Sequence, residues 1–262
     1  MSMPNLTSTL TSTSPRVRSS VGVMRVLIVG AGRLGQAAAD ILLRTQKATR
    51  AVELIGFVDD DPALLGWKYL AASVLGGVAS IRNIPHDEVL IAVGDNATRC
   101  RLYEQLVRSG DKLATARHSD AAVATDAIVG PGTIVCDRSV IGPGAVIGAN
   151  SIINSGCCIA HGSKLSEHVW AGSAAYLGGE VAVGEGAWIG ADVTILARRR
   201  IGAWSYVDAG SVVERDVPDG LAVSGAPASR AGKGLNAKRS RDSRRSDRMH
   251  CLRPIGQGGP SQ

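Results

Sequence analysis

Residues 140–153 read VIGPGAVIGANSII, and an isoleucine recurs at every sixth position of this stretch. The spacing runs from Val123 to Val213 without a slip, over sixteen positions, of which all but Ala171 are Val, Ile or Leu. An amphipathic α-helix repeats every 3.6 residues and a strand every 2, so neither explains a period of six. The array is the signature of a hexapeptide-repeat parallel β-helix.

Each hexad predicts a short strand and a turn, with the aliphatic side chain filling the interior of a triangular prism. Because three hexads close one coil, sixteen hexads predict between five and six coils. Glycine directly follows eight of the aliphatic positions, and we attribute these glycines to the tight corners of the prism. They are Gly130, Gly142, Gly148, Gly172, Gly178, Gly184, Gly190 and Gly202.

A different pattern precedes the hexads. Residues 25–30 (RVLIVG) form a continuous apolar run, and residues 36–44 (QAAADILLR) have the spacing of a helix. Two more apolar runs, at 52–58 (VELIGFV) and 89–94 (VLIAVG), are followed by a second helical pattern at 95–110 (DNATRCRLYEQLVRSG). Strands that alternate with helices predict a parallel α/β sheet.

The first strand runs into a glycine-rich loop with Gly30, Gly32 and Gly35, and Asp59 follows the second strand. This arrangement is typical of Rossmann-like nucleotide-binding domains, in which glycines let backbone amides approach a phosphate and the acid accepts from a ribose or base. The segment is about half the length of a doubly wound dinucleotide domain, which favours one nucleoside diphosphate over NAD. The alternative is a Rossmann-like loop that binds nothing.

Composition and the terminal sequence bear on where the protein is located in the cell. No apolar run is long enough to span a bilayer, and residues 1–23 are rich in Ser and Thr without the apolar core of a secretory signal. We predict a disordered leader there, with Met24 as an alternative start. Five cysteines without a CxxC spacing indicate reduced thiols and a cytoplasmic protein.

The net charge of +6 comes entirely from the C-terminal residues. Residues 233–262 contain eight Lys or Arg and two Asp, a balance of +6, so residues 1–232 are electrically neutral. A basic tail can bind nucleic acid or an anionic surface, but no aromatic residues interleave with these charges. We therefore expect a solvated, disordered tail at 230–262 and no nucleic-acid partner.

Together these features resemble the sialic-acid O-acetyltransferase family that includes the UDP-4-amino-sugar N-acetyltransferases. The matching stretches are VGAGRLG, GFVDDDP, IAVGDNATR, the hexads and VSGAPAS. The resemblance implies an α/β Rossmann-like sugar-nucleotide-binding domain at 24–117 and a left-handed β-helix acyltransferase domain at 118–229. It also implies a homotrimer, acetyl-CoA bound between neighbouring prisms, and no metal.

The family's sugar-nucleotide contacts, carried onto this chain, fall on the glycine loop, the acids after the second strand and the glycine after the third. These positions are Arg33, Leu34, Gly35, Asp59, Asp60 and Gly94. The family's Gly-His-Gly is replaced by Arg33-Leu34-Gly35, which adds bulk and a charge beside the phosphates.

The family's catalytic base is a histidine seven residues after an asparagine, a spacing kept here by Asn154 and His161. The resemblance therefore implies that His161 is the general base. The acids that flank the family's histidine are replaced by Ala160 and Gly162.

The implied acetyl-CoA contacts fall on Trp170, Ala191 and Ala209. Trp170 replaces a second histidine of the family, and His168 stands two positions away.

These observations predict an acetyltransferase that moves an acetyl group from acetyl-CoA to an amino or hydroxyl group of a nucleotide-linked sugar or sialic acid. An amine is the better nucleophile and needs only a modest base, so we favour an amino sugar. The main alternative is a catalytically weakened sugar-nucleotide-binding scaffold of the same fold, with His161 as an ordinary corner residue. A metal-dependent carbonic anhydrase ranks last, because His118, His161 and His168 lack the spacing of a three-histidine site.

Overall fold

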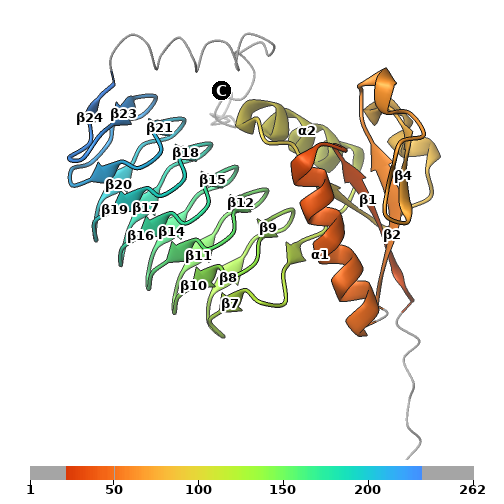
Figure 1. The fold of residues 1–262 in the computed structure, drawn as a ribbon, viewed down its shortest axis with the longest axis horizontal. Coiled ribbons are helices and arrows are strands. Elements are labelled where there is room, and N and C mark those ends of the chain that lie inside the picture. The colour runs from red at the N-terminus through yellow and green to blue at the C-terminus, as the bar shows by residue number, and fades with distance from the viewer. Residues whose placement is uncertain (1–21, 50, 232–262) are drawn as a thin grey trace, which may run out of the picture.

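The computed structural model describes residues 22–49 and 51–231, and it contains an α/β unit followed by a parallel β-helix (Figure 1). The leader predicted at 1–23 and the basic tail predicted at 230–262 lie almost entirely outside the described residues.

The α/β unit is a five-stranded sheet in the order β3-β4-β2-β1-β5, and only β3 runs antiparallel to its neighbour. The predicted strands and helices are present, although the third strand ends at Ile91 rather than at the following glycine. The short pair β3–β4 and the two 3₁₀ turns were not predicted. The elements are β1 (Met24–Val29), α1 (Arg33–Thr49), β2 (Val52–Val58), η1 (Pro62–Leu64), β3 (Lys68–Tyr69), β4 (Ala72–Gly76), η2 (Val78–Asn83), β5 (Glu88–Ile91) and α2 (Asn96–Ser109).

The hexads form a left-handed β-helix, as predicted. Each strand pairs in parallel with the strand eighteen residues later, as Val140 does with Cys158 and Cys158 with Tyr176, so three hexads make one coil. The hexad strands are β7 (Ala122–Val123), β8 (Ile128–Val129), β9 (Ile134–Val135), β10 (Val140–Ile141), β11 (Val146–Ile147), β12 (Ile152–Ile153), β13 (Cys158–Ile159), β14 (Lys164–Leu165), β15 (Trp170–Ala171), β16 (Tyr176–Leu177), β17 (Ala182–Val183), β18 (Trp188–Ile189), β19 (Thr194–Ile195), β20 (Arg200–Ile201), β21 (Tyr206–Val207) and β22 (Val212–Val213). Three further strands, β6 (Ala116–Arg117), β23 (Ala222–Ser224) and β24 (Ser229–Arg230), extend one of the three sheets at its ends.

The six-periodic residues fill the prism, as the sequence predicts. Each is the second residue of its strand, and all are buried in one continuous cluster except Val123 and Val129, which are partly buried in the first coil. Burial of these aliphatic side chains is the main source of stability in a domain with so few aromatic residues.

The expected reason for the glycines that follow these positions was wrong. None of the eight has a positive φ. A Cβ on Gly130 would instead lie 2.6 Å from the Ala149 nitrogen in the next coil, so glycine is needed there for close approach between coils. The left-handed corner residue stands three positions after the aliphatic one, as at Asn150 (φ 54) and His168 (φ 62).

The two architectures share a core. Helix α1 lies between the sheet and the β-helix (Figure 1), where Ala38 and Ile41 belong to the same buried cluster as Ile134 and Ile152 of the first coils. A common apolar core fixes the α/β unit against the end of the prism.

Candidate functional site

A pocket of ≈ 410 Å³ opens at the carboxyl ends of β1 and β2, beside α2. Of the six residues expected to contact a sugar nucleotide, Asp59 and Asp60 line it. Thr98, Arg101 and Gln105 line it from α2, and none of these three was predicted. Ligands of open α/β sheets bind at the carboxyl ends of the strands, so the location fits a nucleotide.

The paired acids have different roles in the pocket. Asp59 uses Oδ2 to accept from the backbone N–H of Ala31 (2.8 Å), which holds the glycine loop, and Oδ1 to accept from the N–H of Asp61 (3.0 Å) in the turn after β2. Asp60 uses Oδ1 to accept from the Val78 N–H (2.8 Å). Oδ2 of Asp60 has no hydrogen bond to the residues that the structure describes, so it is the carboxylate oxygen available to a ligand.

The remaining nucleotide candidates do not line the pocket. Gly35 is buried, and a Cβ there would collide with the Gly30 carbonyl, so this glycine serves the packing of α1 on β1. Arg33 is exposed at the first turn of α1, and Leu34 is half-buried against the shared core. Gly94 lies in the loop before α2, where a Cβ would be 3.8 Å from the Trp170 ring. The structure thus brings Gly94 and Trp170 together.

His161 lies on an exposed corner after β13, outside the pocket. Its imidazole extends over Gly179 in the next coil, where a Cβ would lie 2.6 Å from both Nε2 and Cε1 of the ring. Gly179 has no positive φ, so the imidazole, rather than the backbone, requires glycine at this position. The ring makes no hydrogen bond to the residues that the structure describes.

Asn154 does not contact this imidazole. Its side-chain Nδ2 donates to the Ala171 carbonyl (2.7 Å) in the next coil, which is a structural role.

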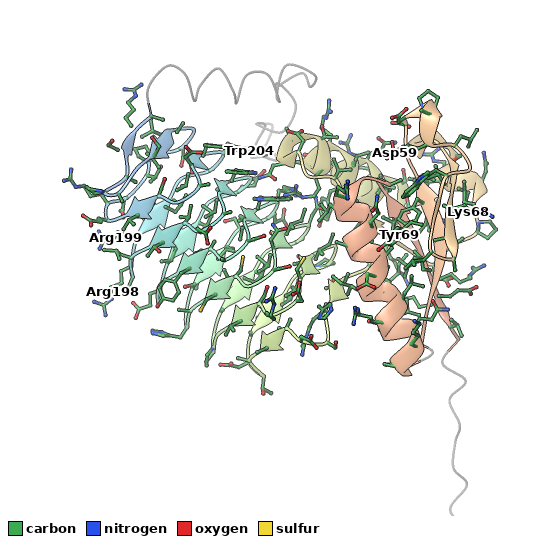
Figure 2. All side chains as sticks on the ribbon, viewed as in Figure 1. Asp59, Lys68, Tyr69, Arg198, Arg199 and Trp204 are labelled. Atoms are coloured by element: carbon green, nitrogen blue, oxygen red, sulfur yellow. The ribbon has the colours of Figure 1, made fainter. Side chains whose placement is uncertain are left out.

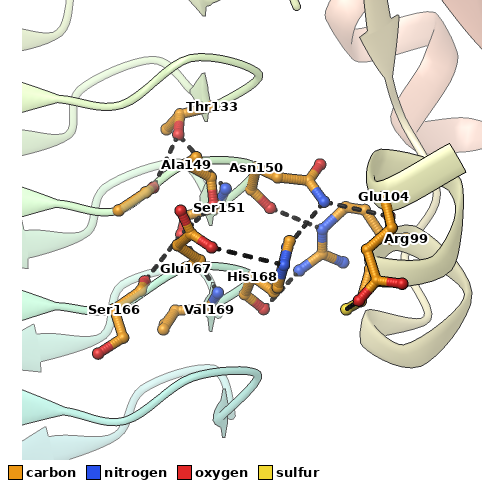
Figure 3. A network of polar contacts seen from close by, with 12 residues as sticks. Arg99, Glu104, Thr133, Ala149, Asn150, Ser151, Ser166, Glu167, His168 and Val169 are labelled. Atoms are coloured by element: carbon orange, nitrogen blue, oxygen red, sulfur yellow. Dashed lines mark hydrogen bonds and ion pairs between the residues drawn. The ribbon is translucent and has the colours of Figure 1, made fainter. Parts of the chain in front are cut away.

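His168 is buried on a different corner from His161 (Figure 3). It therefore does not take the place of the family's second histidine, which Trp170 replaces in this chain. Its Nδ1 accepts from Asn150 Nδ2 (2.9 Å), and the same amide donates to the Arg99 carbonyl (3.1 Å). The Tyr103 ring packs edge-on at 5.1 Å. Burial, and then the charge of Arg99, lower the pKa of His168 to about 4, so the ring is neutral at physiological pH.

Arg99 joins α2 to the β-helix and was missed in the sequence (Figure 3). It is fully buried and donates to the carbonyls of Asn150 (2.9 Å) and His168 (2.8 Å), and to those of Val93 (3.1 Å) and Gly94 (3.3 Å). Burial lowers its pKa to about 10, which leaves the guanidinium charged at neutral pH. The sequence signal that could have identified Arg99 is its position one turn after Asp95, the residue that caps α2.

The three candidate coenzyme residues do not form one cluster. Ala191 and Ala209 occupy the same corner in successive coils, and the Gly210 N–H donates to the Ala191 carbonyl (2.8 Å). Trp170 stands on β15 and packs against the shared core instead. Beside the corner, Trp188 and Tyr206 stack in parallel with their centroids 4.4 Å apart.

One group of described side chains has the chemistry of metal ligands. Ligand atoms of Cys100, His168 and Glu185 lie within 4.8 Å of one another. However, Asn150 occupies Nδ1 of His168, so the proton is on Nε2 and neither ring nitrogen is free to bind a metal. The group contains a single histidine, and the three-histidine centre of a carbonic anhydrase is not formed by the described residues.

No helix among residues 22–49 and 51–231 has the length and apolar character to cross a membrane.

The chain combines a hexapeptide-repeat β-helix with a small nucleotide-type α/β unit. Residues 25–106 match the PglD N-terminal domain. Among curated proteins, no relative matches the chain.

Solved structures match most of the chain. PerB from Caulobacter crescentus, in complex with CoA and GDP-perosamine, is 30% identical over 80% of this chain and 99% of its own, with a TM-score of 0.73. The acetyltransferase domain of PglB from Neisseria gonorrhoeae, in complex with acetyl coenzyme A, is 28% identical over 80% of this chain and 100% of its own, with a TM-score of 0.74. The chain therefore belongs to the sugar N-acetyltransferases of the hexapeptide β-helix family.

Proposed function

We propose that this protein transfers the acetyl group of acetyl-CoA to the amino group of a nucleotide-linked sugar, with His161 as general base. The observation that carries the proposal is the imidazole of His161, which is exposed at a coil corner, lies over Gly179 and has no hydrogen bond to any residue that the structure describes. The PerB and PglB relatives were solved with CoA and GDP-perosamine or with acetyl coenzyme A, which supports the same two substrate classes here. A hydroxyl group, as in a sialic acid, is the second possible acceptor.

In the proposed reaction, the sugar nitrogen attacks the thioester carbon while the imidazole of His161 removes a proton from that nitrogen. The C–S bond then breaks, and the thiolate of CoA takes up the proton. Backbone N–H groups at the corner would stabilise the developing oxyanion. The reaction is redox-neutral, and the proposal invokes no metal.

The pocket at the end of β1 and β2 is the proposed nucleotide site. We propose that Oδ2 of Asp60, which has no hydrogen bond to the described residues, accepts a hydrogen bond from a base or ribose. Arg101, whose guanidinium donates to Thr98 Oγ1 (3.2 Å), offers a positive charge for a phosphate. These assignments keep residues 24–117 as the sugar-nucleotide domain and 118–229 as the acyltransferase domain.

The coenzyme site is proposed along the corner formed by Ala191 and Ala209, with Trp170 at the domain boundary. Small side chains at a corner allow a pantetheine arm to lie against the backbone. We propose that a neighbouring prism closes this corner in a homotrimer. Among the described residues, the thiols of Cys136, Cys157 and Cys158 are in no disulfide, which is consistent with a cytoplasmic location.

The test is a thiol-release assay with acetyl-CoA against UDP-, GDP- and dTDP-linked amino sugars. His161→Ala should lower kcat by roughly 10²–10⁴-fold, the usual worth of a positioned general base. Circular dichroism should be unchanged, because His161 does not fill the prism. If the unmutated protein binds a sugar nucleotide but releases no thiol with any acceptor, the binding-scaffold alternative replaces this proposal.

A further inference from the structure

The proposed base has no acid beside it in the sequence, because Ala160 and Gly162 flank His161. An imidazole that accepts a proton works best with a partner that selects its tautomer and stabilises the imidazolium. In a β-helix such a partner can also come from the adjacent coil, eighteen residues away.

Glu180 stands one coil beyond Gly162 at the same corner. Its backbone N–H donates to the His161 carbonyl (2.9 Å). Its Cγ lies 3.4 Å from the position that a Cβ on Gly162 would take, so the glutamate stem occupies the space beside that glycine. The His161 ring extends over Gly179, the residue directly before Glu180. The imidazole and the glutamate side chain therefore share one corner.

The carboxylate of Glu180 is paired with Arg198, one coil further along, at 3.4 Å from Nε. The side chains of this pair are 55% and 75% exposed, so the ion pair is weak and can exchange partners. Figure 2 shows Arg198 projecting from the β-helix, away from the α/β unit that carries Asp59. In this structure Arg198 therefore holds the carboxylate.

We propose that Glu180 is the positioning residue of His161, and that its carboxylate leaves Arg198 to pair with the imidazole when the ring takes a proton. This inference rests on the proposed role of His161 as general base. It assigns to the next coil the orienting acid that the sequence neighbours of His161 do not supply.

The kinetic test compares three single variants in the thiol-release assay. Glu180→Gln should lower kcat by about 10- to 100-fold, the worth of one hydrogen bond to a charged group, with little change in KM. Arg198→Met, which frees the carboxylate, should leave kcat equal or raise it. The matched control is Glu214→Gln, an exposed glutamate after β22 at the same corner two coils beyond Glu180, which should behave as the unmutated protein.

Two combined variants separate positioning from structure. Glu180→Gln added to His161→Ala should cause no further loss, because the carboxylate acts through the imidazole. Ala160→Glu added to Glu180→Gln should recover part of the lost rate by placing an acid on the other side of the ring.

A spectroscopic readout makes the proposal independent of turnover. In ¹⁵N-histidine-labelled protein that carries Arg198→Met, which frees the Glu180 carboxylate, the His161 ring nitrogens, assigned with His161→Ala, should show one dominant neutral tautomer. Glu180→Gln should move these signals toward the tautomer mixture of a free imidazole, and Glu214→Gln should not. If Glu180→Gln changes the His161 ring signals but no acceptor releases thiol, the proposed function fails and the pairing of Glu180 with His161 stands. Equal ¹⁵N signals with and without Glu180→Gln on the Arg198→Met background, together with equal kcat in Glu180→Gln and the unmutated protein, would overturn the inference.

Discussion

At the scale of single residues, glycines serve several separate purposes in this chain. Gly35 allows α1 to approach β1, Gly130 allows two coils to approach each other, and Gly179 makes room for the imidazole of His161. None of the three has a positive φ, so the missing side chain matters more than backbone freedom. The reason for each glycine is a neighbour in space that is distant in the sequence.

The paired acids after β2 lead to a prediction about nucleotide affinity. Asp60→Ala removes the carboxylate whose Oδ2 is free, and it should weaken UDP- or GDP-sugar binding by about 10- to 100-fold, the worth of a hydrogen bond to a charged group. Asp59→Ala should weaken it too, because the Ala31 N–H loses its acceptor and the glycine loop loosens. Calorimetry should show unchanged affinity for acetyl-CoA. Equal loss of both ligands would contradict the separation of the two sites.

At the scale of elements, the β-helix is a stack of coils held by parallel ladders and by tight backbone contacts at the corners. The Gly130 N–H donates to the Ile147 carbonyl (2.8 Å), so this corner cannot move away from the next coil without losing a ladder bond. An inserted or deleted residue would break both the ladder hydrogen bonds and the corner contacts. This explains why the six-residue period of the sequence persists without a slip.

Gly130→Ala should destabilise the protein. The added Cβ would lie 2.6 Å from the Ala149 nitrogen and 2.9 Å from its Cα, both backbone atoms that cannot give way cheaply. Overpacking of this kind lowers the free energy of unfolding by about 1–3 kcal/mol. The matched control is Gly32→Ala, which has open space around the Cβ and no positive φ. Urea unfolding that shows equal stability for the two variants would refute the close-approach explanation.

At the scale of the whole molecule, the α/β unit and the β-helix are joined by an apolar core around α1 and by the polar network around Arg99. Arg99 has no acidic partner in that network and is held by four backbone carbonyls. Fixing the two units together sets the position of the proposed nucleotide pocket relative to the prism.

The network around His168 predicts how stability depends on pH. The pKa of His168 is lowered to about 4 from its ordinary value of 6.5. Above pH 6.5 the ring is neutral in both folded and unfolded chains. Between pH 6.5 and 4 only the unfolded chain gains the proton, so the free energy of unfolding should fall with pH by up to ~3 kcal/mol.

The measurement is urea unfolding across this pH range, with His168→Gln as the comparison. Glutamine does not titrate, so the variant should lose stability less steeply as the pH falls. Groups that titrate in both proteins contribute equally to the two pH profiles, so their contributions cancel when one profile is subtracted from the other. Parallel pH profiles would show that His168 does not carry this effect.

The outer face of the prism supports a prediction about assembly. Val140 and Tyr176, which are 44% and 47% exposed, lie on the same sheet on either side of Cys158. An apolar column of this kind is a surface that another copy can cover. Light scattering at micromolar concentration should report a mass near three times 27.1 kDa. A monomer would contradict both the trimer and the intersubunit coenzyme site.

The sequence by itself determined the β-helix, its coil number and the α/β unit, because each depends on a local period that needs no knowledge of distant contacts. It also singled out His161, Asp59 and Asp60 through motif spacing. The tertiary structure alone decided that Asp60, rather than Asp59, has a free oxygen, that His168 is buried, and that Arg99 joins the two units. It also decided that Glu180 shares the corner of His161, because the winding of the chain places residues eighteen positions apart in adjacent coils.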